Sequence, residues 1–307
     1  MKSLPCLACV ILLVLCMPVG FAADTAELWL LSTREACNAA STDINSTFRY
    51  RRLTADNQWQ STAADEFFST DATKPLVVFI HGNDTGSTEA VSKGQYVYDV
   101  IRCAIGEQPI RFVIWSWPAE RVCRRRRPDL QLKLWRCNEE SFRLACWLDR
   151  IDPATPICLI GHSFGPRIIT GAMHLLGGGK LNGRKLPEET VAAWSSVGRR
   201  GVRAVLLAAA GDAGSLAPHG AHGCALKMLD RTLITQNPCD RVLRFYPRLY
   251  GRRGPPALGF VGPCGVEEYA EKLLVVDVRC TVGKQHDWRA YCTAENVRSH
   301  WWEFINP

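Results

Sequence analysis

Residues 157–169, ICLIGHSFGPRII, join an apolar run to a helix-like segment through a serine that stands between two glycines. Gly161, Ser163 and Gly165 fill the fixed positions of a G-x-S-x-G motif. The run before the motif predicts a buried strand. Pro166, directly behind it, suits the first turn of a helix, where no backbone N–H is needed.

A sharp strand-to-helix turn forces its central residue into a strained backbone conformation and holds that side chain above the sheet. Its neighbours must be small because strand and helix approach closely there. The motif therefore predicts a presented Ser163 hydroxyl, with the N–H of Phe164 aimed at the place where an oxyanion would form. The alternative is a tight turn whose serine has no special role.

Short apolar runs alternate with longer helix-like segments along the whole chain. The runs predict strands at residues 27–31, 48–53, 76–80, 111–115, 157–160, 202–208, 232–236 and 273–278. The segments between the runs suit helices at 90–105, 130–148, 166–176, 241–249 and 297–304, and in 130–148 apolar residues recur three and four apart. Unbroken apolar runs are typical of parallel strands covered by helices on both faces. We therefore expect an α/β fold, a doubly wound and mostly parallel sheet of about eight strands.

Ligands bind such sheets outside the carboxyl ends of the strands, so the residues that follow each run are the candidates for a site. A nucleophilic Ser163 needs a base, and the base needs a carboxylate. His286 follows the last run, and His300, in the closing helix, is the alternative base. Asp240 follows the 232–236 run and also suits a helix N-cap. Asp212 is the alternative carboxylate.

The run at 76–80 ends in the sequence HGND, at residues 81–84. A loop at this position can supply a second backbone donor to the oxyanion, beside the N–H of Phe164. The N–H of Asn83 is the candidate, with the N–H of Asp84 as the alternative.

These segments resemble the α/β-hydrolase superfamily across residues 27–304. The resemblance is carried by VVFIHGN, VIWSWP, LIGHSFGPRIITGAMHLL, ITQNPCDRVLRFY and VGKQHDWRAY, and the first four also resemble a group of uncharacterised bacterial serine α/β hydrolases. It implies the α/β-hydrolase fold, with Ser163 as nucleophile, Asp240 as acid and His286 as base. Gln285 departs from the pattern, because a glycine often precedes the histidine.

The resemblance and the residues together predict a serine hydrolase that cleaves carboxylic esters of small molecules or lipids through an acyl-enzyme intermediate. An acyltransferase or a peptidase would use the same triad, and a non-catalytic binding protein could share the scaffold. We expect no cofactor. We also expect no metal site, because the single C-x-x-C, Cys6 to Cys9, lies in the N-terminal leader.

The N-terminus has the layout of a secretory signal peptide over residues 1–22, with an apolar core at 7–17 and the G-x-A pattern of a cleavage site. An uncleaved membrane anchor is the alternative, because residues 4–21 are nearly long enough to span a bilayer. We expect an exported hydrolase domain, 23–307, that is periplasmic, extracellular or membrane-associated.

The chain has 14 cysteines, of which three lie in the leader, so an odd number remains. In an oxidising compartment we expect disulfides between Cys123 and Cys137 and between Cys224 and Cys239, each closing a loop of about fifteen residues. Cys158 lies within an apolar run, and we expect it to be buried and unpaired.

The formal net charge of +7 is modest, and the basic residues are not spread over a broad surface. A nucleic-acid-binding surface is therefore not expected. The basic residues concentrate in one run, either a solvated loop or a weak contact with anionic surfaces, at Arg124, Arg125, Arg126 and Arg127. This run lies in a long connection, 118–150, which could contribute a lid or an insertion.

Overall fold

The computed structural model describes residues 27–37, 47–69, 71–195, 201–251 and 254–306. The expected signal peptide, 1–22, and the start of the expected domain at residue 23 lie outside these ranges. Within them, no helix is both long and apolar enough to cross a bilayer.

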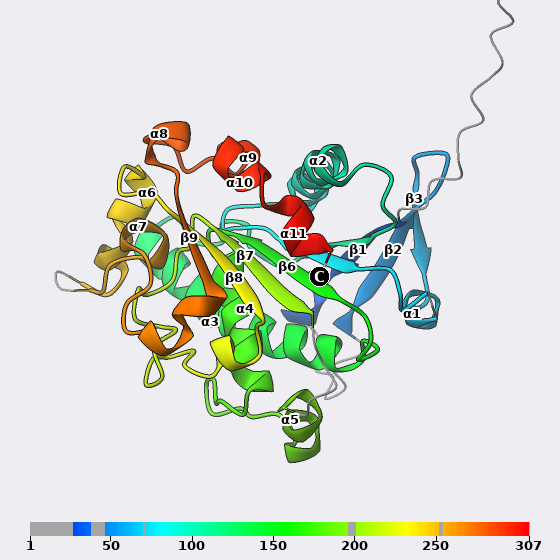
Figure 1. Ribbon diagram of the computed structural model, residues 1–307, viewed down its shortest axis with the longest axis horizontal. Coiled ribbons are helices and arrows are strands. Elements are labelled where there is room, and N and C mark those ends of the chain that lie inside the picture. The colour runs from blue at the N-terminus through cyan, green and yellow to red at the C-terminus, as the bar shows by residue number, and fades with distance from the viewer. Residues whose placement is uncertain (1–26, 38–46, 70, 196–200, 252–253, 307) are drawn as a thin grey trace, which may run out of the picture.

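Nine strands of the described chain form one sheet in the order β3-β2-β1-β5-β4-β6-β7-β8-β9 (Figure 1). Every pairing from β1 through to β9 is parallel, whereas β2 and β3 add an antiparallel edge. The strands are β1 Glu27–Ser32, β2 Arg49–Leu53, β3 Trp59–Thr62, β4 Leu76–Ile80, β5 Arg111–Ser116, β6 Ile157–His162, β7 Val202–Leu207, β8 Arg231–Gln236 and β9 Leu273–Asp277.

The centre of the sheet is apolar on both faces, as the unbroken runs predict. Every residue of β4, β5 and β6 is buried, because helices cover both sides. The edge strand β3 has the sequence WQST and carries no such run, which is why the sequence did not predict it. The doubly wound α/β sheet of the α/β-hydrolase fold is confirmed.

Helices cover the two faces of the sheet, with α3 and α4 on one side and α2, α9 and α11 on the other (Figure 1). The α-helices are α1 Ala64–Phe68, α2 Ser87–Ile105, α3 Arg126–Asp149, α4 Gly165–Leu176, α5 Glu188–Ser195, α6 Arg241–Arg244, α7 Leu258–Val261, α8 Arg279–Val282, α9 Trp288–Thr293, α10 Glu295–Arg298 and α11 Trp301–Ile305. Short 3₁₀ turns are η1 Arg34–Cys37, η3 Ala225–Lys227, η4 Tyr246–Leu249 and η5 Glu267–Lys272.

Two expected helices are interrupted in the structure. The segment 241–249 divides into α6 and η4, and Pro247, which lacks an N–H and cannot continue an α-helix, stands in the second piece. The segment 297–304 divides at Ser299 and His300 into α10 and α11.

Most of the connection 118–150 is a core helix. Residues 126–149 form α3, which packs on α4 and buries Leu144, Trp147 and Leu148. Of this connection, only residues 118–125 precede α3 and could form a lid. Their role as a lid stays a prediction.

Both predicted disulfides are wrong, because all four cysteines are free. Cys123 precedes α3, whereas Cys137 lies eleven residues inside it, about 16 Å along the helix axis. Cys224 and Cys239 lie beyond opposite ends of β8, whose 6 residues span about 20 Å. A disulfide needs Cα atoms about 4.4–6.8 Å apart. Cys158 is buried and unpaired, as expected.

The contact between α2 and β5 gives a test of packing. A methyl group at Gly94 of α2 would lie 2.4 Å from Cγ1 of the buried Ile114. Alanine is the better helix former by about 1 kcal/mol, but overpacking a core costs about 1–3 kcal/mol. The three nearest atoms, at 2.4–2.7 Å, all belong to Ile114, so we expect an overpacking cost in the upper part of that range. Gly94→Ala should therefore lower the free energy of unfolding by about 1–2 kcal/mol in denaturant titrations.

The matched control is Gly214→Ala, where the added methyl group meets nothing within 4 Å. Its stability should stay within about 0.5 kcal/mol of wild type. If Gly94→Ala proved as stable as this control, the close α2–β5 packing would be contradicted.

Candidate active site

The serine motif forms a sharp turn between β6 and α4. Ser163 has a φ of 58°, in the left-handed region that a residue with a side chain rarely adopts. Its N–H donates to the carbonyl of Leu207 at 3.0 Å, and its own carbonyl accepts from the N–H of Ala210 at 2.9 Å. The end of β7 and the residues after it therefore hold the strained turn on both sides.

Glycine is required around this turn by close contacts with backbone. A Cβ on Gly165 would lie 2.2 Å from the carbonyl oxygen of Ile80, and one on Gly161 would lie 2.5 Å from the nitrogen of Pro166. A Cβ on Gly82 would lie 2.8 Å from Cβ of Ser163. The serine therefore sits at a point where two strands and a helix approach as closely as backbone allows.

The three residues predicted as a triad are brought together by the structure. Ser163 follows β6, Asp240 follows β8, and His286 lies in the loop between α8 and α9. Nε2 of His286 lies 2.9 Å from Oγ of Ser163, and Nδ1 of His286 lies 2.7 Å from Oδ2 of Asp240. This arrangement can pass the serine proton to the imidazole while the carboxylate holds the ring in place.

Asp240 is fully buried and accepts four hydrogen bonds. Its Oδ1 accepts from the N–H groups of Val242 at 2.8 Å and Leu243 at 3.0 Å, so the same side chain caps α6. Its Oδ2 accepts from His286 and from the hydroxyl of Tyr291, which lies at 2.7 Å. Burial alone would raise the pKa of Asp240, but these hydrogen bonds outweigh it and leave the pKa below its usual value.

Tyr291 is a site residue that the sequence reasoning missed. Its hydroxyl donates to Asp240 and accepts from Nδ2 of Asn237 at 3.0 Å, and that amide also donates to the carbonyl of Gly283 at 2.9 Å. Burial raises the pKa of Tyr291, so the hydroxyl stays a donor at neutral pH. A tyrosine five residues after the histidine belongs to no recognised motif, so the sequence offered no signal for it.

The alternative site residues lie elsewhere. Nδ1 of His300 faces Glu303 at 3.5 Å, next to α11. Oδ1 of Asp212 accepts from the hydroxyl of Tyr246 at 2.7 Å. Neither side chain makes a hydrogen bond with Ser163 within the described chain.

The two candidate donors to the oxyanion differ in their availability. The N–H of Asp84 donates to the carbonyl of Ala119 at 2.9 Å and is therefore engaged. Within the described part of the chain, no hydrogen bond uses the N–H of Asn83 or that of Phe164. Asn83 remains the candidate second donor, and the assignment of both groups to an oxyanion hole stays a prediction.

The orientation of the Asn83 N–H depends on His81, whose ring is fully buried. The N–H of Trp117 donates to Nε2 of His81 at 3.3 Å, so Nδ1 carries the proton and donates to the carbonyl of Gly82 at 2.9 Å. Burial lowers the pKa of His81 to about 3, so the ring stays neutral. The Gly82 carbonyl and the Asn83 N–H belong to one peptide group, and His81 therefore fixes both.

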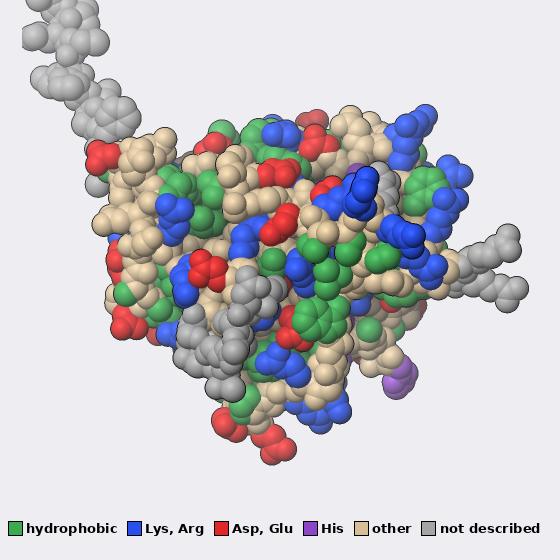
Figure 2. Space-filling model, turned by 180° about the vertical axis from the view of Figure 1, so that it is seen from behind, with side chains coloured by type: hydrophobic (Ala, Val, Ile, Leu, Met, Phe, Trp, Pro, Cys, Tyr) green, Lys and Arg blue, Asp and Glu red, His purple; other side chains and the backbone are tan. Residues whose placement is uncertain are grey.

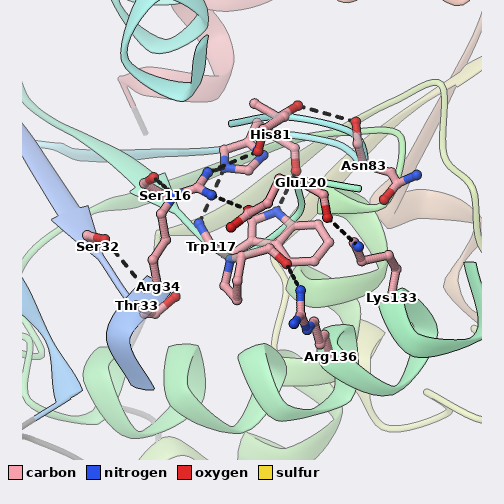
Figure 3. Close-up of polar contacts among 12 residues, drawn as sticks. Ser32, Thr33, Arg34, His81, Asn83, Ser116, Trp117, Glu120, Lys133 and Arg136 are labelled. Carbon is pink, nitrogen blue, oxygen red and sulfur yellow. Dashed lines mark hydrogen bonds and ion pairs between the residues drawn. The ribbon is translucent and has the colours of Figure 1, made fainter. Parts of the chain in front are cut away.

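Arg34, from η1, ties this loop to the segment after β5 (Figure 3). Its Nε donates to Oγ of Ser116 at 2.8 Å, one terminal nitrogen pairs with Glu120 at 2.5 Å, and the other donates to the carbonyl of Thr85 at 3.1 Å. The second terminal nitrogen also lies 3.5 Å from Nε2 of His81. A guanidinium has five donors in a rigid fork, so one side chain can hold all these groups at once.

The segment after β5 is itself fixed by α3. Nζ of the buried Lys133 donates to the carbonyl of Glu120 at 2.6 Å, and Arg136 donates to the carbonyl of Pro118 at 2.7 Å (Figure 3). The segment after β5 is thereby anchored to α3.

Comparisons with known proteins give no family. No family model and no curated protein matches the chain, so the narrower resemblance to a bacterial group has no support from them. Solved structures that are similar include TT1662 from Thermus thermophilus, with 14% identity, a TM-score of 0.40, and coverage of 85% of this chain and 94% of that one. A cutinase-like protein from Cryptococcus sp. has 12% identity, a TM-score of 0.38, and coverage of 76% and 95%.

The catalytic core of acetyl xylan esterase from Trichoderma reesei has 15% identity, a TM-score of 0.37, and coverage of 77% and 98%. At these values the fold assignment rests on the sheet topology and the turn at Ser163, described above.

Tyr291→Phe tests the support of Asp240. Because the folded-state pKa of Asp240 lies below its unfolded value, its ionisation stabilises the fold above about pH 4 and this contribution is lost as pH falls through the folded pKa. Removing one donor raises the folded pKa toward the unfolded value. We expect the free energy of unfolding at pH 7 to fall by about 1–2 kcal/mol.

The difference between this variant and wild type should shrink in a series of denaturant titrations at falling pH, once the pH passes through the folded pKa of Asp240. An equal loss at every pH at which the protein stays folded would mean that Tyr291 acts through packing alone.

Arg34→Ala tests the loop support. Removing a hydrogen-bond donor to an oxyanion typically lowers the reaction rate by about 10²–10³-fold. Displacing the donor should lower the rate by a smaller factor. We expect a fluorophosphonate to label Ser163 at least about tenfold more slowly in the variant. Exogenous guanidinium should restore part of the rate.

Arg298→Ala, at an exposed position on α10, is the matched control and should label at the wild-type rate. Wild-type labelling of Arg34→Ala would show that the loop keeps its conformation without the arginine.

Proposed function

We propose that this protein is a serine hydrolase that cleaves carboxylic esters through an acyl-enzyme intermediate. One observation carries the proposal: a continuous hydrogen-bonded chain runs from Oγ of Ser163 through His286 to Asp240, with distances of 2.9 and 2.7 Å. The left-handed backbone of Ser163 supports it, because such a turn presents the hydroxyl above the sheet.

In the first half of the reaction, Oγ of Ser163 attacks the ester carbonyl carbon while Nε2 of His286 takes the hydroxyl proton. The electron pair of the carbonyl π bond moves to oxygen, and the N–H groups of Phe164 and Asn83 bind that oxyanion. The tetrahedral intermediate collapses, the bond to the leaving alcohol breaks, and His286 returns the proton to the alcohol oxygen.

In the second half, water replaces the alcohol. His286 takes a proton from water as its oxygen attacks the acyl carbon, and the same two N–H groups bind the second oxyanion. Collapse releases the carboxylic acid and returns the proton to Ser163. Throughout, the low pKa of Asp240 keeps it ionised, so it stabilises the imidazolium and holds the ring by Nδ1.

We propose esters of small molecules or lipids as the substrates. We also propose that the mature chain is exported. Export rests on the sequence of residues 1–22 alone. Arg124, Arg125 and Arg127 are exposed, which is compatible with contact to anionic surfaces, whereas the side chain of Arg126 lies outside the described atoms. Membership of the uncharacterised bacterial group also remains a proposal.

Substitution of the nucleophile tests the reaction. Ser163→Ala and His286→Ala should each lower ester turnover by at least about 10⁴-fold, because the two residues act as one unit. The double variant should be no slower than either single variant, for the same reason. Rates are measured with a soluble chromogenic ester, and a fluorophosphonate should modify Ser163.

Ser92→Ala, at an exposed serine of α2, is the control and should keep the wild-type rate. Turnover of esters by Ser163→Ala at the wild-type rate would refute the proposal. Amide and thioester panels, and added acceptor alcohols, distinguish an esterase from a peptidase or an acyltransferase.

A further inference from the structure

Exposed apolar side chains gather on the elements that follow Asp240. Val242 is 54% exposed, Phe245 49%, Tyr250 42% and Val261 40%, which makes four of the eight large apolar residues that are exposed in the described chain. They come from α6, η4 and α7 and the residues beside them, and α6 contacts both of the other elements. The elements that carry the four side chains therefore adjoin one another.

The same elements carry unpaired positive charge. Arg241, Arg244 and Arg248 are exposed, and none of them pairs with a carboxylate of the described chain. The guanidinium carbon of Arg248 lies 4.4 Å from the ring centroid of Phe245, so charge and apolar surface are in contact. The sequence has no Asp or Glu between Asp240 and Glu267.

We call this surface the arginine–apolar rim, and its members are Arg241, Val242, Arg244, Phe245, Arg248, Tyr250 and Val261. Figure 1 places α6 and α7 at one end of the molecule, at the left. That end lies at the right in Figure 2, where blue side chains surround green ones.

The rim lies directly beside the candidate active site. Asp240 caps α6, so the rim begins at the residue that follows the acid of the triad. The N–H of Arg241 donates to the carbonyl of Lys284, two residues before His286. A surface that docked on the rim would therefore lie next to the segments that carry Asp240 and His286.

A second segment with the same composition flanks the site from the other side. Val122 is 55% exposed, and with Arg121 and Arg124 it lines a surface hollow in the segment after β5. Because β4, β6 and β7 lie between β5 and β8, the two segments lie on either side of Ser163.

We propose that the arginine–apolar rim docks on an anionic lipid surface and that the substrates are esters carried by lipids in that surface. This proposal rests on the proposed function and names its substrate class. Arginines are attracted to anionic headgroups, and apolar side chains between them gain by entering the acyl boundary. An anionic polysaccharide would neutralise the arginines but leave the aliphatic Val242 and Val261 in water.

The binding experiment uses the purified protein and sedimentation with vesicles. Wild type should bind vesicles that contain phosphatidylglycerol more tightly than vesicles of phosphatidylcholine alone, with part of the binding retained in high salt because of the apolar contact. Each arginine near an anionic membrane contributes ~1 kcal/mol to binding, which corresponds to about a fivefold change in the partition coefficient. Arg244→Gln combined with Arg248→Gln should therefore lose about 25-fold.

Phe245→Ser should reduce the salt-resistant part of the binding, because it removes one of the four apolar side chains of the rim. The matched controls are Trp302→Ser, at a side chain 50% exposed on α11, and Arg298→Gln on α10. Both controls should bind vesicles as wild type does, and thermal unfolding should show that every variant is folded.

The activity experiment separates docking from catalysis. Rim variants should hydrolyse a soluble short-chain ester at the wild-type rate but an ester embedded in anionic vesicles more slowly, by the factor lost in binding. Equal vesicle binding by the rim variants and wild type overturns the proposal, as does binding to an anionic polysaccharide that vesicles do not compete. If wild type binds vesicles but cleaves no ester, the proposed function fails and the docking surface stands.

Discussion

The close approach of β4, β6 and α4 around Ser163 is the constraint on which the rest of the site depends. With glycine at 161 and 165, the strand can turn into the helix so abruptly that the serine adopts a φ of 58°. The strain is held by hydrogen bonds to Leu207 and Ala210, which belong to the next strand and its loop. The hydroxyl is thus presented by packing of the sheet rather than by a flexible loop.

The polar groups around the serine are held in a similar way, each by hydrogen bonds to neighbouring elements. Tyr291 and the first turn of α6 saturate the Asp240 carboxylate. His81 fixes the peptide group of Asn83, and Arg34 links that loop to the end of β5 and the segment that follows it. Precise positions for reacting groups require such outer support, because a displacement of a few tenths of an ångström weakens transition-state contacts.

The sequence predicted the parts of this molecule that are local or patterned. Unbroken apolar runs identified the parallel strands, and the serine motif with its flanking glycines identified the turn. The strand β3 and the supporting residues Arg34 and Tyr291 depend on tertiary contacts that no local pattern records. The expected disulfides failed for the same reason, because spacing along the chain says nothing about which side of an element a cysteine occupies.

Asp240 anchors both the imidazole of His286 and the first turn of α6, where the arginine–apolar rim begins. A substitution that reshapes this turn therefore also shifts the carboxylate, so natural or engineered variation of the rim is constrained at its start. In the described chain, no hydrogen bond joins the rim residues after Phe245, which are Arg248, Tyr250 and Val261, to the triad. Natural variation should accordingly accumulate in η4 and α7, where it can alter the proposed docking surface without altering the chemistry of the triad.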